Sequence, residues 1–561
     1  MQISEFKGIQ QYHDGRPVSD YCNMIPLGNS VIDRYGEEYI KAKTSTYFTG
    51  PVLETFVDSL GNIYIAMSTT VVKTSLVEEG GEIKYTTPEA ILGEVTGYNP
   101  GKHPVTFVES STKPSQVYCC DGKNVWYWNT TDVQIPIQQI DPVFVDRYVA
   151  FKPIKLPLFK DIDSLMVGGI SLREWISTHL ESDSDSPGTY VGWWPDYDDF
   201  SGSNPTVIDS IAWFDNRLVL VEKVNNTVWL SAVDPSRWTV PTHTIASSEH
   251  DYLYPRLPWQ VVSSEDDSLY DEMFPNYYAS TASSANIQEV AAFSGQLYFL
   301  NDTSIEVWSA TGNDDNPIQH NSQNTLYYGG RSPVIINDTL YLICKGAIQN
   351  DFIAAINQSG AITHVSNDEI ERMLLPKPFR IRPLAVRDQS MIVVYTDEGY
   401  RNGYAITKHG FWWRYWNDYN FAIAWSVVNF NGTQVGVDRW GGLAIATESN
   451  RKYLNGRPIP RTICGGWIQF TGRKILREME IICDTGVYLD PNQDRSQLFL
   501  RVSFDRGITY GPYLYRKLGA SGMNNRVMIW RNCGSGNSML LHFGTSDNVR
   551  FQIYGLRFEL V

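Results

Sequence analysis

The chain has 561 residues, a formal net charge of −16 and 13% aromatic residues. This length predicts two or three domains, and the aromatic-rich composition favours β structure and excludes a disordered chain. No Lys/Arg-rich run occurs, which argues against tight, sequence-tolerant DNA binding, whereas an acidic protein that lets DNA slide past is compatible with this charge.

The first residues, "MQISEFKGIQQYHDG", contain no apolar core long enough for a signal peptide, and no apolar run approaches the ~18 residues of a membrane helix. We therefore expect a protein made in the cytoplasm, without a membrane anchor. The seven cysteines are scattered without a CxxC pair and are expected to be reduced thiols. Cys119 and Cys120 alternate along a predicted strand, so one thiol should face inward and the other outward.

One local pattern recurs along the chain: an apolar segment, a Gly/Asn/Asp turn and an apolar-aromatic strand. Such period-two segments around a turn predict antiparallel hairpins. The copies are "FVDSLGNIYIAMSTTVVKTS" from Phe56, "VYCCDGKNVWYWN" from Val117, "IAWFDNRLVLVEKVNNTVWLSAV" from Ile211, "VAAFSGQLYFLNDTSIEVWSATG" from Val290, "VIINDTLYLICKG" from Val334, "LAVRDQSMIVVYTDEG" from Leu384 and "VVNFNGTQVGVDRWGGLAIAT" from Val427.

The spacing of these copies indicates a radial array. The anchor residues that follow the turns, Leu297, Leu340, Met391 and Gln434, are 43, 51 and 43 residues apart, and a four-stranded propeller blade takes ~40–50 residues. The earlier anchors, Ile63, Val125 and Leu218, are further apart and require insertions. A β-propeller fits this pattern, and the alternative is a run of unrelated hairpins in sandwich domains.

Two stretches interrupt the repeat, at about 133–205 and 240–287. The first contains "SLREWISTHLES", where Ser171 and Glu174 form a capping box for a short helix. Both also hold acidic, aromatic loops, which are either solvated surface loops or partner-binding and channel-lining excursions. After about 458, strands at short, regular spacing, of which "RTICGGWIQFTG" and "LREMEIICDTG" are the first two, predict a C-terminal antiparallel β-sandwich. The predicted order is an N-terminal arm (1–50), a propeller-like domain (51–457) and the sandwich (458–561), an all-β fold.

Motifs for nucleophilic, phosphate-binding and zinc chemistry are absent from the sequence, and we expect no cofactor, no metal and no catalytic residue. One segment, "VSFDRGITYGPY", has the Asp-box pattern that sialidases and other propeller-fold glycosidases repeat in several blades. Here the pattern occurs once, outside the blades, so we interpret it as a structural turn. Its residues are Ser503, Asp505, Gly507, Thr509 and Tyr510. Asp505 should accept amide hydrogen bonds, Gly507 should supply a positive φ, and Thr509 and Tyr510 should resume the strand.

The order of several segments resembles the packaged-DNA stabilisation proteins of short-tailed bacteriophages, also called tail nozzle or head-closure proteins. The similar segments cover most of residues 205–561 and, weakly, residues 15–60. They are "VSDYCNMIPLG", "VIDSIAWFDNRLVLVEKVNNTVWLSAVDPSRWT", "VAAFSGQLYFLNDTSIEVWSATG", "THVSNDEIERML" (a helix start in the family), "LFLRVSFDRGITYG" and the last strand "YGLRFELV".

This resemblance implies a virion tail protein that forms a homohexameric ring below the portal and adaptor. The ring would close the DNA channel, retain the packaged genome, let DNA pass without tight binding, and dock a needle, tailspikes or fibres. We hypothesise that acidic residues line or gate this channel. The candidates are Asp196, Asp198, Asp199, Glu265, Asp266, Asp267, Asp314 and Asp315. The alternative function is a propeller-fold, glycan-cleaving or glycan-binding phage tail protein.

Overall fold

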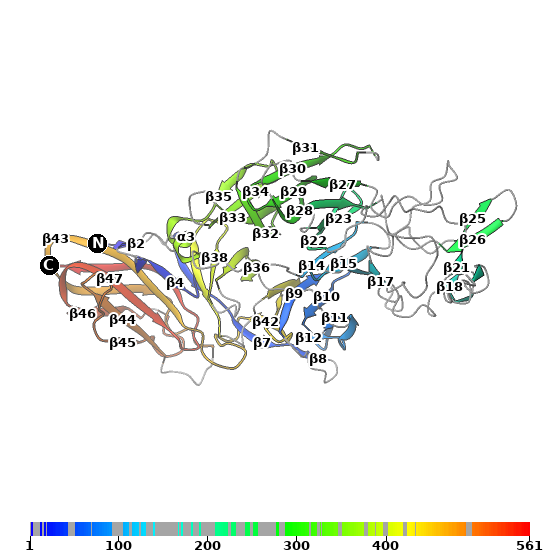
Figure 1. Cartoon of the computed structure of the whole chain (residues 1–561). Coiled ribbons are helices and arrows are strands. Elements are labelled where there is room, and N and C mark those ends of the chain that lie inside the picture. The colour runs from blue at the N-terminus through cyan, green and yellow to red at the C-terminus, as the bar shows by residue number, and fades with distance from the viewer. Residues whose placement is uncertain are drawn as a thin grey trace. The chain divides into compact units, whose positions relative to one another are not determined.

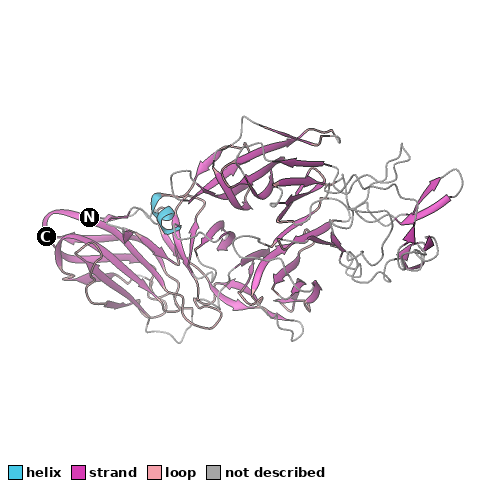
Figure 2. Cartoon of the chain, viewed as in Figure 1, coloured by secondary structure: helices cyan, strands magenta, loops and turns pink. Residues whose placement is uncertain are grey.

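In the computed structural model, the regular structure of the described residues is almost entirely strand (Figure 2). The one helix among the described residues is α3 (Asp368–Leu374), and the all-β class is confirmed. The residues described are 2–3, 12–13, 16–17, 19–42, 51–68, 70–92, 105–111, 115–122, 125–130, 138–140, 166–167, 170–171, 181–182, 190–191, 208–222, 226–231, 242–246, 251–255, 276–279, 286–313, 316–321, 326, 328–345, 351–374, 380–386, 389–396, 402–418, 423, 425–431, 433–489, 496–524 and 526–561.

The chain divides into two compact units. The first unit comprises residues 1–51, 76–87 and 334–561, and the second comprises residues 52–75 and 88–333. The domain boundaries proposed from the sequence, after residues 50 and 457, stay predictions.

Among its described residues, the second unit contains four antiparallel meanders of four strands each (Figure 1). The strands are β9 (Val52–Val57), β10 (Asn62–Met67), β11 (Thr70–Glu79) and β13 (Glu89–Leu92); β14 (Thr106–Glu109), β15 (Gln116–Cys120), β16 (Val125–Asn129) and β17 (Gln138–Ile140); β22 (Ser210–Phe214), β23 (Arg217–Glu222), β24 (Thr227–Leu230) and β27 (Asn276–Ala279); and β28 (Ile287–Phe293), β29 (Gln296–Asn301), β30 (Ile305–Ala310) and β31 (Ile318–His320). From Leu76 onward, β11 belongs to the first unit and pairs there with β12 (Glu82–Tyr85).

Three further meanders of the same kind follow along the chain. Their strands are β32 (Gly329–Ile336), β33 (Thr339–Lys345), β34 (Asp351–Asn357) and β35 (Ile362–His364); β36 (Arg380–Val386), β37 (Gln389–Tyr395), β38 (Asn402–Ile406) and β39 (Trp412–Trp416); and β40 (Trp425–Phe430), β41 (Thr433–Val437) and β42 (Leu443–Thr447). The fourth strand of the last meander is β7 (Gly36–Tyr39), which pairs antiparallel with β42.

Each of the seven segments that repeat in the sequence lies in one of these seven meanders, so the propeller-like repeat is confirmed. The turn residues explain why the hairpins could be predicted from the sequence. Asp215 and Asn216, between β22 and β23, both have positive φ (48° and 58°), as a tight hairpin turn requires. One anchor differs from the others. Val125 begins the third strand of its meander, whereas Leu218 and Leu297 lie in the second.

The prediction for the adjacent cysteines was wrong, because both thiols are fully buried. Cys119 packs in a cluster with Tyr64 and Val117, and Cys120 packs in another with Ile208. The alternation along β15 holds, but hydrophobic residues cover both faces of the sheet. A propeller blade is packed on two sides, so neither face of its central strands meets water.

The C-terminal part of the first unit is an antiparallel β-sandwich, as predicted (Figure 1). Its strands are β43 (Arg461–Cys483), β44 (Gln497–Ser503), β45 (Leu514–Lys517), β46 (Met528–Arg531), β47 (Ser535–Thr545) and β48 (Gln552–Leu560). Large side chains fill it, and Trp530 and Phe543 are almost completely buried. Their burial provides much of the hydrophobic stabilisation of this part.

The two strands predicted within residues 461–483 are a single strand, β43. Its first half pairs with β47, and its second half pairs with β46 and β48. The register with β47 shifts between Gly465 and Ile468 and again between Gln469 and Lys474, and Gly472 has a φ of 104°. These irregularities let one strand pass from one sheet to the other.

The first 42 residues add strands to both the sandwich and the last meander. The strands are β1 (Gln2–Ile3), β2 (Tyr12–His13), β3 (Arg16–Pro17), β4 (Asp20–Cys22), β5 (Met24–Pro26), β6 (Val31–Asp33), β7 and β8 (Lys41–Ala42). β1 and β6 pair with β48, and β4 pairs with β43. The described strands β1, β4 and β6 of the N-terminal arm therefore pair with strands of the same chain.

The two predicted insertions are described only in short pairs. These are β18 (Met166–Val167) with β19 (Ile170–Ser171), β20 (Glu181–Ser182) with β21 (Tyr190–Val191), and β25 (Thr242–Ala246) with β26 (Asp251–Pro255). A short helix was predicted to begin at the capping box of Ser171 and Glu174. Ser171 ends β19 and Glu181 begins β20, and residues 172–180 lie outside the described residues.

Candidate functional site

The acidic residues proposed to line a channel all lie outside the described residues. They are Asp196, Asp198, Asp199, Glu265, Asp266, Asp267, Asp314 and Asp315. Their role stays a prediction. Within the described part of the chain, no group of three His, Cys, Asp or Glu side chains is placed to hold a metal ion.

The Asp-box turn is described completely and follows β44. The Asp505 carboxylate accepts hydrogen bonds from the Thr509 amide (2.8 and 3.0 Å), from the Thr509 hydroxyl (2.5 Å) and from the Ser503 hydroxyl (2.7 Å). The Gly507 amide donates to Ser503 Oγ (2.7 Å), and Gly507 has a φ of 82°. Desolvation alone would raise the pKa of Asp505, but the bonds from Thr509 and Ser503 lower it to about 2. The carboxylate is therefore occupied by its own turn.

Turns of the propeller-like repeat contain the same arrangement. An Asp or Asn side chain accepts the amide hydrogen of the residue four positions later in three of them. The pairs are Asp58 with Asn62 (2.8 Å), Asn357 with Ala361 (3.0 Å) and Asp438 with Gly442 (2.7 Å). Asp505 thus shares its geometry with hairpin turns of the repeat, and this supports a structural role.

The sequence predicts that the strand resumes at Thr509 and Tyr510, and this prediction was wrong. β45 begins only at Leu514. Gly511 still donates to the Val502 carbonyl (2.9 Å), but Pro512 has no amide hydrogen and interrupts the ladder. Tyr510 instead turns back over the sheet, where its hydroxyl contacts Cys464 Sγ at 3.2 Å.

Replacing Asp505 with Ala should lower the free energy of unfolding of the sandwich by about 1 kcal/mol, because the turn is partly exposed and loses charge-assisted hydrogen bonds. Asp505→Asn keeps one acceptor oxygen and should lose less. Urea unfolding of the three proteins checks this order. An Ala variant as stable as the parent protein would show that the carboxylate does not stabilise the turn.

An aromatic and cationic column covers the outer face of β44 and β45. The Arg501 guanidinium lies between the rings of Tyr510 (4.9 Å) and Tyr513 (4.5 Å), and Tyr513 stacks on Tyr515 at 5.9 Å. His542 on β47 packs edge-on against Tyr510 and Phe499. Burial of the imidazole, together with Arg501 and Arg414, lowers the pKa of His542 to about 4.

The depressed pKa of His542 predicts acid sensitivity in a defined window. Because the unfolded chain takes up this proton near pH 6.5 and the folded chain only near pH 4, stability should fall as the pH is lowered through that range. Partial exposure of the ring reduces the effect to about 1–2 kcal/mol. His542→Phe keeps the aromatic packing and should flatten the dependence of unfolding free energy on pH between 4 and 6.5. His409→Gln, at an exposed turn position, is the control, and equal slopes in the parent protein and His542→Phe would contradict this assignment.

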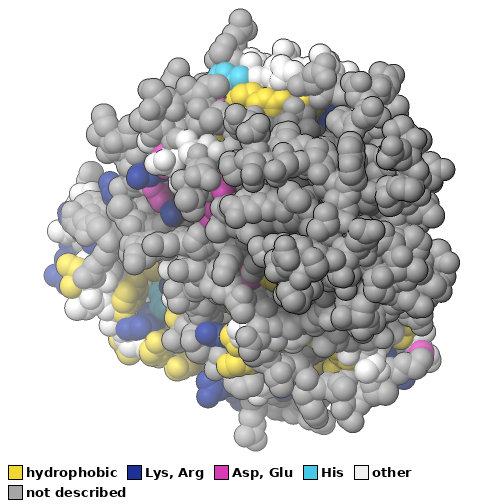
Figure 3. Space-filling view, turned by 45° about the vertical axis from the view of Figure 1, so that its right-hand side comes forward, with side chains coloured by type: hydrophobic (Ala, Val, Ile, Leu, Met, Phe, Trp, Pro, Cys, Tyr) yellow, Lys and Arg dark blue, Asp and Glu magenta, His cyan; other side chains and the backbone are white. Residues whose placement is uncertain are grey.

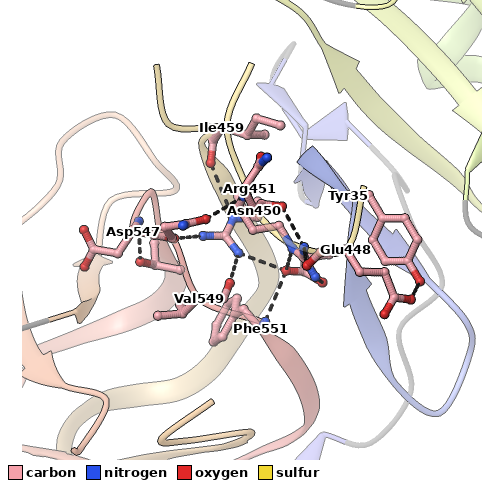
Figure 4. Close-up of polar contacts among 12 residues, drawn as sticks. Tyr35, Glu448, Asn450, Arg451, Ile459, Asp547, Val549 and Phe551 are labelled. Carbon is pink, nitrogen blue, oxygen red and sulfur yellow. Dashed lines mark hydrogen bonds and ion pairs between the residues drawn. The ribbon is translucent and has the colours of Figure 1, made fainter. Parts of the chain in front are cut away.

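A buried ionic cluster joins the N-terminal arm to the sandwich (Figure 4). Asp33, at the end of β6, is fully buried and accepts hydrogen bonds from Arg451 Nε (2.7 Å), Arg461 Nη1 (2.9 Å) and the Phe551 amide (3.2 Å). Arg461 also donates to the carbonyls of Asp547 and Val549. Burial lowers the pKa of Arg461 to about 10 although Asp33 opposes this shift, so Arg461 remains charged at neutral pH.

A second buried pair lies next to this cluster in the sequence. Arg34 forms an ion pair with Glu37, and its guanidinium lies 4.4 Å from the centre of the Tyr415 ring. It also donates to Asn23 Oδ1 (3.3 Å) and Asn417 Oδ1 (3.1 Å). The arm is therefore held to residues of the last two meanders and of the sandwich by buried, fully hydrogen-bonded charges, which position strands that are distant in sequence.

The local sequence pattern does not predict this cluster. Asp33 is separated from Arg451 and Arg461 by more than 400 residues, and hydrophobic periodicity carries no information about ionic partners. The only local signal is the pair Asp33-Arg34 directly after the apolar Val31 and Ile32, where a charged residue continues a strand whose preceding residues are buried.

The surface of the described residues mixes charge with apolar groups. On the face that Figure 3 shows, Lys and Arg side chains lie beside hydrophobic ones. Several large apolar side chains are exposed, among them Ile508, Tyr513 and Tyr515. In the described part of the chain, no helix has the length and apolar character needed to cross a membrane.

Comparison with solved structures adds only weak likenesses. They include a streptogramin B lyase (11% identity, 73% of this chain and 97% of that chain, TM-score 0.36), a catalytically inactive virginiamycin B lyase from Staphylococcus aureus with quinupristin (12%, 73% and 98%, 0.35) and a functionally unknown protein from Desulfotomaculum acetoxidans (11%, 74% and 95%, 0.33). At this level of similarity they carry no argument about activity. No curated protein matches the chain.

Two family models match, and both describe the same phage protein. Residues 261–376 match the β-propeller of bacteriophage P22 Gp10, and residues 463–561 match its β-sandwich. The matches occur in the order in which the repeat and the sandwich follow each other in this chain. These two regions, which together make up less than half of the chain, are similar to bacteriophage P22 Gp10, and the resemblance to packaged-DNA stabilisation proteins is confirmed.

Proposed function

We propose that this chain is the subunit of a tail ring, a nozzle below the portal and adaptor of a short-tailed phage. The observation that carries the proposal is the match of two consecutive regions to the propeller and the sandwich of one phage protein. The proposed ring is a homohexamer that retains the packaged genome, lets DNA pass during ejection, and docks a needle, tailspikes or fibres.

The chemistry of the chain is compatible with this role. A net charge of −16 disfavours tight binding to phosphates, and a conduit should not hold the DNA that moves through it. The buried charges around Asp33 and Arg34 fix the arm to its own chain, which supports a rigid subunit. We further propose that the protein has no catalytic activity, because the Asp-box carboxylate is occupied by its own turn.

The alternative is a glycan-cleaving tail protein, and incubation with capsular and sialylated glycans distinguishes the two. Our proposal expects no cleavage, and release of oligosaccharides would refute the claim of a non-catalytic protein. For the ring, imaging of the purified protein together with its adaptor should show six copies around an axial channel. A monomeric complex would contradict the ring.

The proposed acidic lining of the channel has its own test. Replacing Asp196, Asp198 and Asp199 together with Ala should alter retention of packaged DNA, measured as nuclease-sensitive DNA released from filled particles. A second variant replaces Glu265, Asp266 and Asp267 with Ala, and a third replaces Asp314 and Asp315 with Ala. Leakage equal to that of the parent particle in all three variants would count against a gating role for these loops.

A further inference from the structure

A pocket of about 430 Å³ opens beside the Asp-box turn, within the sandwich. Its size lies within the ~300–1,000 Å³ range of small-molecule sites. Residues of β43, β44, β45 and β47, of the loop after β44 and of the loop before β47 line it: Arg473, Val502, Phe504, Asp505, Thr509, Gly511, Pro512, Leu514, Cys533, Ser535, Gly536 and Asn537. Neither the proposed ring nor the structural turn requires such a pocket.

Arg473 is the cation of this pocket. Its Nε and Nη2 donate to Ser535 Oγ, at 3.1 and 2.8 Å. Within the part of the chain that the structure describes, it forms no ion pair with a carboxylate. A guanidinium has five N–H groups and binds a carboxylate through two parallel hydrogen bonds, so Arg473 has donors left for an anionic group of a ligand.

The other walls combine an aromatic ring with hydroxyl and amide groups. Phe504 is held in place by two glycines, because a Cβ at Gly534 or Gly536 would lie 2.5 or 2.7 Å from its side chain. Pro512 adds a second apolar wall, and the Thr509 hydroxyl and the Asn537 amide contribute polar groups. The pocket is thus already formed. Arg473 forms no ion pair with a carboxylate among the described residues, and the Asp505 carboxylate, which also lines the pocket, accepts hydrogen bonds from Thr509 in its own turn.

We propose that this pocket binds an acidic saccharide unit, with the sugar carboxylate on Arg473. A pyranose ring has apolar C–H faces, which suit Phe504 and Pro512, and hydroxyls, which suit Thr509 and Asn537. A peptide with a free carboxylate would satisfy Arg473 but would leave the polar groups opposite without sugar hydroxyls. This binding activity goes beyond the proposed ring and does not depend on it.

Calorimetric titration of the full-length protein tests the proposal. The probes are trigalacturonate, a glucuronate trisaccharide and N-acetylneuraminate, with the methyl ester of trigalacturonate as the uncharged control and tri-alanine as the peptide control. At least one acidic sugar should bind with a Kd on the order of 1 mM, and the methyl ester should bind about tenfold more weakly because it lacks the charge.

The variants locate the binding. Arg473→Gln should weaken binding about tenfold, and Arg473→Lys should recover part of it because it restores the charge without the fork. Arg477→Gln is the matched control: Arg477 lies four residues later on β43 and is exposed like Arg473, but it pairs with Glu559 at 3.0 Å outside the pocket. It should bind as the parent protein does. No binding by any acidic sugar, equal binding by Arg473→Gln, or binding of tri-alanine alone would overturn the proposal.

Discussion

Replacing Asp33 with Ala is expected to lower the free energy of unfolding of the first unit by about 3–5 kcal/mol, because the change leaves Arg451 and Arg461 buried without their shared carboxylate. Asp33 is fully buried, and the two arginine side chains are at most 2% exposed. The Phe551 amide also loses its acceptor. The loss should be visible as a lower urea midpoint and as faster hydrogen exchange in β6 and β48.

Glu559→Ala is the matched control for this prediction. Glu559 pairs with Arg477 at 3.0 Å, but both side chains are more than half exposed, and such surface pairs contribute less than about 1 kcal/mol. If Asp33→Ala cost no more than Glu559→Ala, the cluster would not stabilise the junction of arm and sandwich.

Gly544→Ala is expected to destabilise the sandwich by about 3 kcal/mol or to prevent its folding. Gly544 lies on β47 opposite Thr462 of β43, and a Cβ there would lie 2.2 Å from the Arg461 carbonyl oxygen and 2.7 Å from Thr462 Cα. Because these are backbone atoms, the two strands would have to separate, and overpacking of this kind is costly.

Gly465→Ala provides the comparison within the same strand pair. Gly465 pairs with Leu541, and its nearest contact for a Cβ is Ile463 Cγ2 at 3.4 Å, an ordinary van der Waals distance. It should lose less than about 1 kcal/mol. Thermal unfolding of both variants measures the difference, and equal losses would mean that the close approach at Gly544 is not a constraint.

The repeat could be predicted from sequence because its signals are local. Turn residues such as Asp215 and Asn216 lie between strands with period-two alternation, and all seven predicted hairpins have counterparts in the structure. The Asp-box turn is equally local, since Asp505 and Thr509 are four residues apart. The segment after the turn was not predictable in this way. Thr509 and Tyr510 resemble strand residues, but because Pro512 has no amide hydrogen, β45 begins only at Leu514.

The features that the sequence did not reveal are non-local. β7 completes a meander with β42, more than 390 residues later, and Asp33 meets Arg451 and Arg461 over a similar separation. Local periodicity cannot identify such partners. β43 was predicted as two strands because the glycines at 465, 466 and 472 resemble loop residues, whereas they lie in the part of the strand where its register shifts. The acidic candidates, lying outside the described residues, gain no support from the fold.

The most direct test of the central claim is a cryo-EM reconstruction of the phage particle that contains this protein. The account predicts a ring of six copies in the tail, below the portal and adaptor, with both the propeller-like repeat and the sandwich fitting the density and an axial channel through the ring. Density for this chain at another site of the particle, or a copy number and arrangement without a central channel, would contradict it.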